Sequence, residues 1–194
     1  MGKLNGKKIN TAVFISGRGS NLRSLISFFK KKDSPILINL IISNNSNAKG
    51  LSYAKKSKIK YYVANFKNKI VSEKKVLEKL FDNKIDLVCL AGFMKILSSD
   101  FIKKFKKPIL NIHPSLLPRY KGLNAHKKVI KNGDKYSGTT VHLVNSKLDS
   151  GKIILQKKIK IAKYENEKTL EKKILKAEHK LYPKAIQKFL TSNF

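Results

Sequence analysis

Apolar runs of strand length alternate along this chain with segments in which apolar positions recur at helical spacing. The apolar and β-rich runs predict strands at residues 11–16, 36–42, 60–64, 85–91, 109–112, 138–144 and 152–161. The remaining patterned segments predict helices at residues 21–29, 48–56, 71–81 and 167–190. Proline lacks the N–H that a helix interior uses, so we expect the last helix to be kinked or broken at Pro183.

This alternation predicts an α/β fold. Most strand runs are apolar nearly throughout, which indicates a mostly parallel sheet with helices on both faces. Ligands of such sheets bind outside the carboxyl ends of the strands. Because no repeat or linker interrupts the pattern, we expect residues 1–194 to form a single domain, with a basic N-terminal extension at about residues 1–7.

The composition excludes several classes of protein. No stretch approaches the roughly 20 apolar residues of a membrane helix, and no apolar segment follows the charged N-terminus as it does in a secretory signal. Cys89 is the single cysteine and lies in an apolar run, so we interpret it as a core residue. These features indicate a reducing compartment, and we expect a cytoplasmic protein.

The net charge of +31 raises the question of a nucleic-acid partner. Only three of the 43 basic residues are arginines, the residue that grips phosphates and bases with two hydrogen bonds. The lysines are spread along the whole chain. We therefore favour a compositional drift toward lysine over a dedicated nucleic-acid surface, although the positive field would still attract small anionic substrates.

The segment SGRGSNLRSL follows the first predicted strand and opens the first helix. Gly17 and Gly19 permit positive φ, and either Ser20 or Asn21 can cap the helix. Free amides at a helix N-terminus bind anions, so Gly19, Ser20 and Asn21 are candidates for a phosphate site. The motif matches neither GxGxxG, because Leu22 takes the third glycine's place, nor a P-loop. The alternative is an ordinary glycine-rich turn.

The segment LNIHPSLLPRYKG places two polar side chains at the end of an apolar strand. Asn111 and His113 are two residues apart in an extended segment, so both point to one face. Pro114 biases His113 toward extended geometry. An amide donor and an imidazole aimed at one point can stabilise an oxyanion and move a proton. A hydrogen-bonded loop that anchors its neighbours is the structural alternative.

The other candidates are weaker on local grounds. LAGFMKILS offers apolar surface after a strand, and Asp149 in LDSG has ordinary turn chemistry. The remaining histidines, which show no metal-ligand spacing and are interpreted as structural, are His126, His142 and His179. His142 alternates with apolar neighbours and could face the same strand ends as Asp149.

Five segments in this order closely resemble the folate-dependent phosphoribosylglycinamide formyltransferases of purine synthesis: SGRGSN, LAGFMKIL, NIHPSLLPRYKG, GTTVHLVNSKLDSG and AEHKLYP. The resemblance covers residues 8–189. NIHPSLLP with a downstream D-x-G is specific to the wider group that uses 10-formyltetrahydrofolate, and the GxGSN loop narrows it to the glycinamide ribonucleotide enzymes. The resemblance implies the formyltransferase fold, whose first half is Rossmann-like.

The resemblance also implies the binding residues. The substrate phosphate would lie on Gly19, Ser20 and Asn21, and Glu178 would help to hold the glycinamide end. Residues 145–149 would fold over the pterin ring. The residues implied in folate binding are Met94, Lys95, Ile96, Leu97, Asn111, Asn145 and Asp149.

Asn111, His113 and Asp149 would form the catalytic set. Asn111 and a protonated His113 would stabilise the charge on the formyl oxygen, and Asp149 would raise the pKa of His113. Transfer from 10-formyltetrahydrofolate, the cosubstrate, would be direct, through a tetrahedral intermediate. We expect no metal, no specific nucleic acid and no membrane partner, and either a monomer or a homodimer.

Two positions depart from the family pattern. Glu73 occupies the place where alignment on the preceding serine expects an arginine that contacts the folate tail. Three nearby lysines could substitute for it: Lys69, Lys74 and Lys75. A lysine, however, cannot clamp a carboxylate with two hydrogen bonds. Asn124 stands where a histidine is often found.

Two related enzymes and one binding protein remain as alternatives. Methionyl-tRNA formyltransferase shares the HPSLLP-type segment but needs a C-terminal RNA-binding domain, for which we expect no residues here. Formyltetrahydrofolate hydrolase carries an extra N-terminal regulatory domain, which we also expect to be absent. A basic nucleic-acid-binding protein on a degenerate enzyme fold is the third alternative.

Overall fold

The computed structural model describes residues 8–193, so the extension predicted at about residues 1–7 lies outside the described part. One seven-stranded sheet has the order β3-β2-β1-β4-β5-β6-β7. The strands are β1 (Ile9–Ile15), β2 (Ile36–Ser43), β3 (Lys60–Val63), β4 (Leu87–Leu90), β5 (Ile109–His113), β6 (Tyr136–Leu143) and β7 (Ile153–Lys160). All pairings from β3 to β5 are parallel, whereas the β5–β6 and β6–β7 pairings are antiparallel. The predicted mostly parallel sheet is confirmed.

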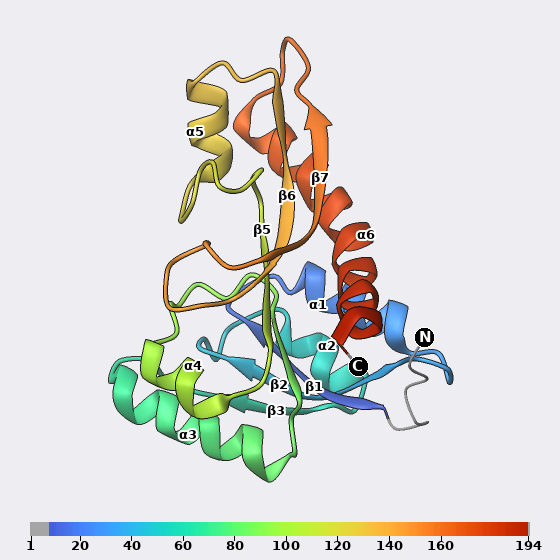
Figure 1. Ribbon diagram of the computed structural model, residues 1–194, viewed down its shortest axis with the longest axis vertical. Coiled ribbons are helices and arrows are strands. Elements are labelled where there is room, and N and C mark those ends of the chain that lie inside the picture. Colours follow the sequence, from blue (N-terminus) through green and yellow to red (C-terminus); the bar gives the residue numbers. More distant parts are fainter. Residues whose placement is uncertain (1–7, 194) are drawn as a thin grey trace.

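Helices cover both faces of this sheet. The helices are α1 (Ser20–Phe29), α2 (Leu51–Lys56), α3 (Lys69–Asp82), α4 (Ser99–Phe105), α5 (Ala125–Lys131) and α6 (Glu167–Asn193). One core cluster packs α1, α2 and α6 against the sheet, and a second packs α3 and α4 against the opposite face. Figure 1 shows α6 beside α1 and the β6–β7 pair, with which it makes contacts. Burial on both faces explains why β1, β2, β4 and β5 are predominantly apolar.

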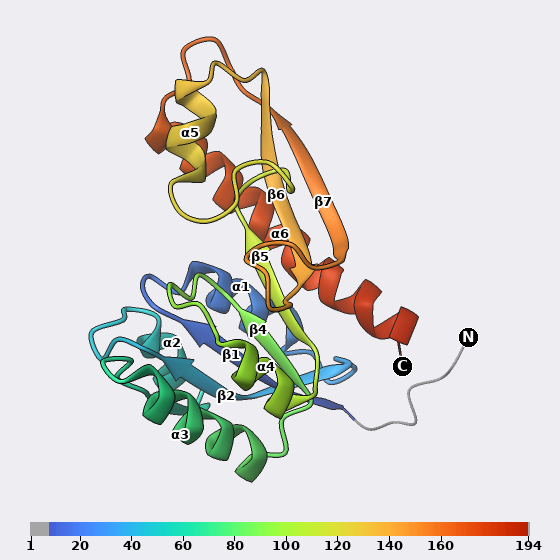
Figure 2. The same cartoon turned by 60° about the vertical axis from the view of Figure 1, so that its left-hand side comes forward.

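The strand order reverses between β1 and β4. The chain leaves β1 toward β2 and β3 on one side and returns to β4 and β5 on the other. At such a point the loops after the two central strands diverge and leave a crevice. Figure 2 shows α5 and the β6–β7 pair extending away from the parallel part of the sheet.

Three expectations about helices need correction. Helix α6 continues through Pro183, so the break expected as one of two outcomes is absent, and buried side chains such as Tyr182 and Ile186 hold the flanking turns. Helices α4 and α5 were not predicted, although Phe101 and Phe105 of α4 are buried at the i, i+4 spacing of a single apolar stripe. Both helices have only seven residues, which is too short for a clear period.

The start of α1 also differs from the prediction. Gly19 is the N-cap residue, with φ of 70°, and no side chain caps the helix, so neither Ser20 nor Asn21 has the predicted capping role. A side chain at position 19 would bring its Cβ to 2.5 Å from the Cα of Gly50. Glycine therefore takes the cap, and both following side chains are left to face the cavity described next.

Candidate active site

A cavity of about 760 Å³ lies at the carboxyl ends of the central strands. Its walls come from the loop after β1, the loop after β4, the end of β5, the loop between β6 and β7, and one side of α6. This is the crevice that the reversal of strand order predicts. One wall is the glycine turn at α1, and exposed apolar side chains line a separate part of the cavity, its apolar end: Met94, Ile96, Leu123 and Leu148.

Every residue of the predicted phosphate, folate, glycinamide and catalytic sets lines this one cavity. Their roles stay predictions, but the structure brings them together from segments up to 159 positions apart, since the first is Gly19 and the last is Glu178. The set is Gly19, Ser20, Asn21, Met94, Lys95, Ile96, Leu97, Asn111, His113, Asn145, Asp149 and Glu178.

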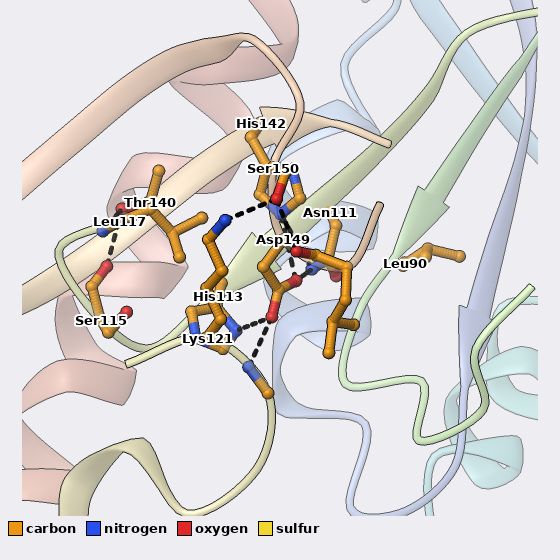
Figure 3. Close-up of polar contacts among 12 residues, drawn as sticks. Leu90, Asn111, His113, Ser115, Leu117, Lys121, Thr140, His142, Asp149 and Ser150 are labelled. Carbon is orange, nitrogen blue, oxygen red and sulfur yellow. Dashed lines mark hydrogen bonds and ion pairs between the residues drawn. The ribbon is translucent and has the colours of Figure 1, made fainter. Parts of the chain in front are cut away.

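Asp149 is the centre of a polar cluster on the cavity wall (Figure 3). Its Oδ2 accepts a 2.8 Å hydrogen bond from Gly122 N and lies 3.4 Å from His113 Nδ1. Its Oδ1 lies 3.4 Å from Asn111 Nδ2 and 3.5 Å from His142 Nε2. The carboxylate therefore contacts both polar side chains of β5 at once.

Two local features create this cluster. Antiparallel pairing sets Asn111 of β5 opposite His142 of β6, and the amide Nδ2 lies 3.2 Å from His142 Nε2. Asp149 has φ of 45°, a left-handed conformation that Asp tolerates better than most residues. Two residues later, a Cβ on Gly151 would lie 1.8 Å from the carbonyl oxygen of Leu143. The D-x-G motif is therefore the tight return that carries Asp149 to the strand ends.

The position of the His113 proton follows from its partners. Nε2 lies 2.8 Å from the carbonyl oxygen of Tyr120, which can only accept, so Nε2 carries a hydrogen. Nδ1 faces Asp149. Burial lowers the pKa of His113 below its usual 6.5, although the Tyr120 carbonyl and Asp149 raise it. The expected upward effect of Asp149 is present, but burial outweighs it, so the net pKa of His113 lies below its usual value.

Asp149 itself is held as an anion. Burial alone would raise its pKa, but His142, the Gly122 N–H and the charge of His113 together lower it to about 2. At neutral pH the cluster thus consists of a carboxylate and a largely neutral imidazole, His113, whose unprotonated Nδ1 faces it. A proton arriving between these two groups would be held by both.

At the other end of the cavity a buried amide and a buried carboxyl pair with each other. Asn21 Nδ2 donates to Glu178 Oε2 at 2.7 Å, joining the start of α1 to α6. Asn21 Oδ1 is buried and has no hydrogen-bond partner in the described part of the chain. Buried polar atoms are nearly always paired, so an unpaired one on a cavity wall marks a place where a ligand donor fits.

Burial raises the pKa of Glu178 to about 7, against the lowering effect of the Asn21 hydrogen bond. A carboxyl whose pKa is higher in the folded than in the unfolded state reduces folding stability as pH rises from about 4.5 to 7. We therefore expect Glu178→Gln to stabilise the protein at pH 8 by about 3 kcal/mol, and to have little effect at pH 5. Urea unfolding at both pH values measures this, with Glu78→Gln as the exposed control. An equal effect at both pH values would contradict the buried titration.

The folate-binding prediction for residues 94–97 needs one refinement. Met94 N donates a 2.7 Å hydrogen bond to Ser16 Oγ, so this backbone group is already engaged by the loop after β1. Ser16 Oγ in turn contacts Asn44 Oδ1. Met94 and Ile96 expose their side chains at the apolar end of the cavity, whereas Leu97 is buried beneath them.

The predicted alignment of Glu73 with the family's arginine that contacts the folate tail is wrong. Its side chain is buried between α3 and α4, where its carboxylate accepts hydrogen bonds from Ser98 N at 2.8 Å and from Ser98 Oγ. Ser98 in turn caps α4. Glu73 thus supports the turn after residues 94–97 from below and does not line the cavity. Asn124 does line it, with φ of 60° at the start of α5.

Three contributors to the site have no role in the sequence interpretation. Tyr182 is fully buried, and its hydroxyl lies 3.1 Å from the carbonyl oxygen of Leu90 and 3.0 Å from that of Leu110, so α6 holds the ends of β4 and β5 together. Glu171 lines the cavity seven positions before Glu178, a spacing that places both on one helix face. The third is the Tyr120–Gly122 turn at the end of the NIHPSLLPRYKG segment, whose Tyr120 carbonyl oxygen contacts His113 and whose Gly122 N–H contacts Asp149.

Within residues 8–193, no three His, Cys, Asp or Glu side chains are grouped so that they could hold a metal ion. In the same part of the chain, the helices are too short or too polar to cross a membrane.

Comparison with known proteins agrees with this geometry. Residues 9–186 match the family model described as formyl transferase. The phosphoribosylglycinamide formyltransferase of Haemophilus influenzae is 41% identical, over 94% of this chain and 87% of that protein. The human trifunctional purine biosynthetic protein adenosine-3 is 41% identical over 93% of this chain, which spans 18% of that protein's length.

Solved structures give the same result. The phosphoribosylglycinamide formyltransferase of Brucella melitensis has a TM-score of 0.89 and 40% identity, over 94% of this chain and 96% of that one. The corresponding protein from Anaplasma phagocytophilum has a TM-score of 0.88 and 41% identity, over 93% and 85% of the two chains. The chain therefore belongs to the formyl transferase family and, within it, to the phosphoribosylglycinamide formyltransferases.

Proposed function

We propose that this chain transfers the formyl group of 10-formyltetrahydrofolate to the amine of N1-(5-phosphoribosyl)glycinamide, a step of purine synthesis. The observation that carries the proposal is the meeting of Asn111 and His113 with Asp149 in the cavity. The glycine turn at α1 suits the phosphate of one substrate, and the apolar end suits the flat pterin of the other. Family membership supports both assignments.

The substrates would occupy the cavity from opposite ends. The phosphate lies on Gly19, Ser20 and Asn21, and the unpaired Asn21 Oδ1 accepts a hydrogen bond from the ribonucleotide. Glu178 holds the glycinamide end through its carboxyl. The pterin lies against Met94, Ile96 and Leu97, with the 145–149 loop over it. The formyl carbon and the amine then meet near the Asp149 cluster. Their proximity by itself increases the reaction rate.

The reaction uses only the electrons and protons of its two substrates. The amine lone pair attacks the formyl carbon, and the carbonyl electron pair moves onto the formyl oxygen. Asn111 Nδ2 turns from its long 3.4 Å contact with Asp149 and donates to this oxygen. The amine proton passes to the pair formed by His113 Nδ1 and Asp149, which creates an imidazolium beside the oxyanion.

Collapse of the tetrahedral intermediate breaks the bond between the formyl carbon and N10 of the folate. The proton held by His113 and Asp149 passes to N10, and no group remains on the protein. The low resting pKa of His113 suits this cycle, because the imidazole starts neutral and returns to neutral after each turnover.

A formyl-transfer assay with glycinamide ribonucleotide and 10-formyltetrahydrofolate tests the proposal. We expect formation of tetrahydrofolate that depends on both substrates, with one formylated ribonucleotide per folate released. Folate release that does not need the ribonucleotide would indicate a hydrolase. Transfer to methionyl-tRNA in place of the ribonucleotide would indicate the tRNA enzyme.

The lysine-rich surface gives a second expectation. If the net charge of +31 acts by attracting the anionic substrates, then raising salt should lower kcat/KM moderately and leave kcat nearly unchanged, because exposed charges are screened beyond about 8 Å at physiological ionic strength. Steady-state rates between low and physiological salt measure both constants. A large fall in kcat itself would mean that surface lysines act on the bound substrates.

A further inference from the structure

A second hollow, of about 580 Å³, lies beside the cavity where α1, α2 and α6 meet. Three cationic side chains line it, Arg18, Arg23 and Lys49, together with the hydroxyl-bearing Ser20 and Ser52. No carboxylate is among its lining residues in the described part of the chain. The hollow is therefore built to receive negative charge.

The use of arginine separates this hollow from the general lysine coat. The chain has three arginines among 43 basic residues, and two of the three line this one hollow. The Arg23 guanidinium lies 5.9 Å from the centre of the Tyr53 ring, which limits where it can point. Among residues 8–193, no salt bridge involves Arg23 or Lys49, so both charges are available.

The hollow is continuous with the glycine turn. Arg18 and Ser20 line both the hollow and the main cavity, and so does Leu175 of α6. Arg18 forms an ion pair with Glu171 of α6, and this exposed pair stands at the boundary between the two spaces. Because exposed ion pairs are weak, a bound anion can draw Arg18 away from Glu171.

We propose that the hollow and the Gly19–Asn21 turn together bind ligands that carry two consecutive phosphoryl groups. One phosphoryl group occupies the turn, and the next lies in the hollow against Arg18, Arg23 and Lys49. Guanidinium groups bind such oxygens with paired, charge-assisted hydrogen bonds. The position of the first phosphoryl group rests on the proposed function.

This arrangement has a functional consequence. A substrate with one phosphate uses the turn and leaves the hollow free. Diphosphate and triphosphate compounds use both and exclude that substrate. Such compounds therefore act as competitive inhibitors toward the ribonucleotide and leave folate binding unaffected.

The test compares inorganic pyrophosphate with inorganic orthophosphate as probes. Titration calorimetry on the full chain at physiological salt, without divalent cations, should give about tenfold tighter binding of pyrophosphate. The more highly charged probe also favours any basic surface. The variant R23Q/K49Q is therefore compared with K103Q/K104Q, which removes the same charge from α4 on the opposite face of the sheet.

We expect R23Q/K49Q to bring the two probes within about twofold of each other and K103Q/K104Q to keep the tenfold preference. Melting temperatures equal to the parent's show that both variants fold. Equal losses in the two variants, or no preference in the parent chain, would overturn the proposal. The formyl-transfer assay is measured separately on each protein, so a parent chain that transfers formyl groups but does not distinguish the probes refutes this inference alone.

Discussion

Asp149→Asn should fold normally, bind both substrates within several-fold of the parent, and lose roughly 10²–10⁴ in kcat, the range for lost acid–base or oxyanion assistance. Asn tolerates the φ of 45° at this position at least as well as Asp, so the turn geometry is retained. What is lost is the carboxylate, held ionised by a pKa of about 2, that in the proposed mechanism receives the amine proton together with His113.

The His113 titration provides an independent measurement. Burial already lowers the pKa of this imidazole, and Asp149 partly offsets that effect. Removing the anion must therefore lower the pKa further, so the imidazolium should disappear at lower pH in the variant. NMR titration of His113 and single-turnover rates give the two readouts, and Asp100→Asn, at an exposed position of α4, is the isosteric control. A variant that keeps more than about a tenth of the rate, with an unmoved titration, would return Asp149 to a turn-forming role.

The second large effect is expected at Asn21. The substitution Asn21→Asp preserves the shape of the side chain but replaces the amide, whose Nδ2 lies 2.7 Å from Glu178 Oε2, with a negative charge beside the proposed phosphate site. Like charges in contact cost several kcal/mol, so binding of glycinamide ribonucleotide should weaken by about 100-fold or more. Folate binding should change by less than about threefold, because the turn lies at the other end of the cavity.

The matched control is Asn145→Asp, the same chemical change on the loop at the folate end. Separate dissociation constants for the two ligands should show opposite patterns in the two variants. The Glu178 pKa should also rise further in Asn21→Asp, because the amide donor is replaced by a negative charge. Equal losses of both ligands in Asn21→Asp would count against the phosphate assignment.

Much of the fold is readable from local pattern. Burial on the two faces of one sheet requires apolar strands, and it requires apolar positions at helical spacing in α1, α3 and α6. Both patterns can be recognised in the sequence. Short elements are not readable in this way. Helices α4 and α5 have seven residues each, and packing rather than periodicity holds them.

In the candidate site, too, some features follow from local sequence and others do not. The sequence alone determined the glycine turn and the shared face of Asn111 and His113, because both follow from backbone geometry within a few residues. Asp149 and Glu178 were predicted from the resemblance to known motifs, because the residues around them give little indication of a role.

Only the tertiary structure decided the hydrogen-bond partners and the protonation of these residues. The antiparallel register of β5 and β6 sets His142 beside Asn111, and the Tyr120 carbonyl settles which His113 nitrogen carries hydrogen. Burial, which no local pattern measures, makes the resting His113 neutral and raises the pKa of Glu178. The environment of Glu73 is also a tertiary property, since its partner Ser98 lies 25 positions away. Protonation and hydrogen bonding depend on neighbours in space, and folding alone brings those neighbours together.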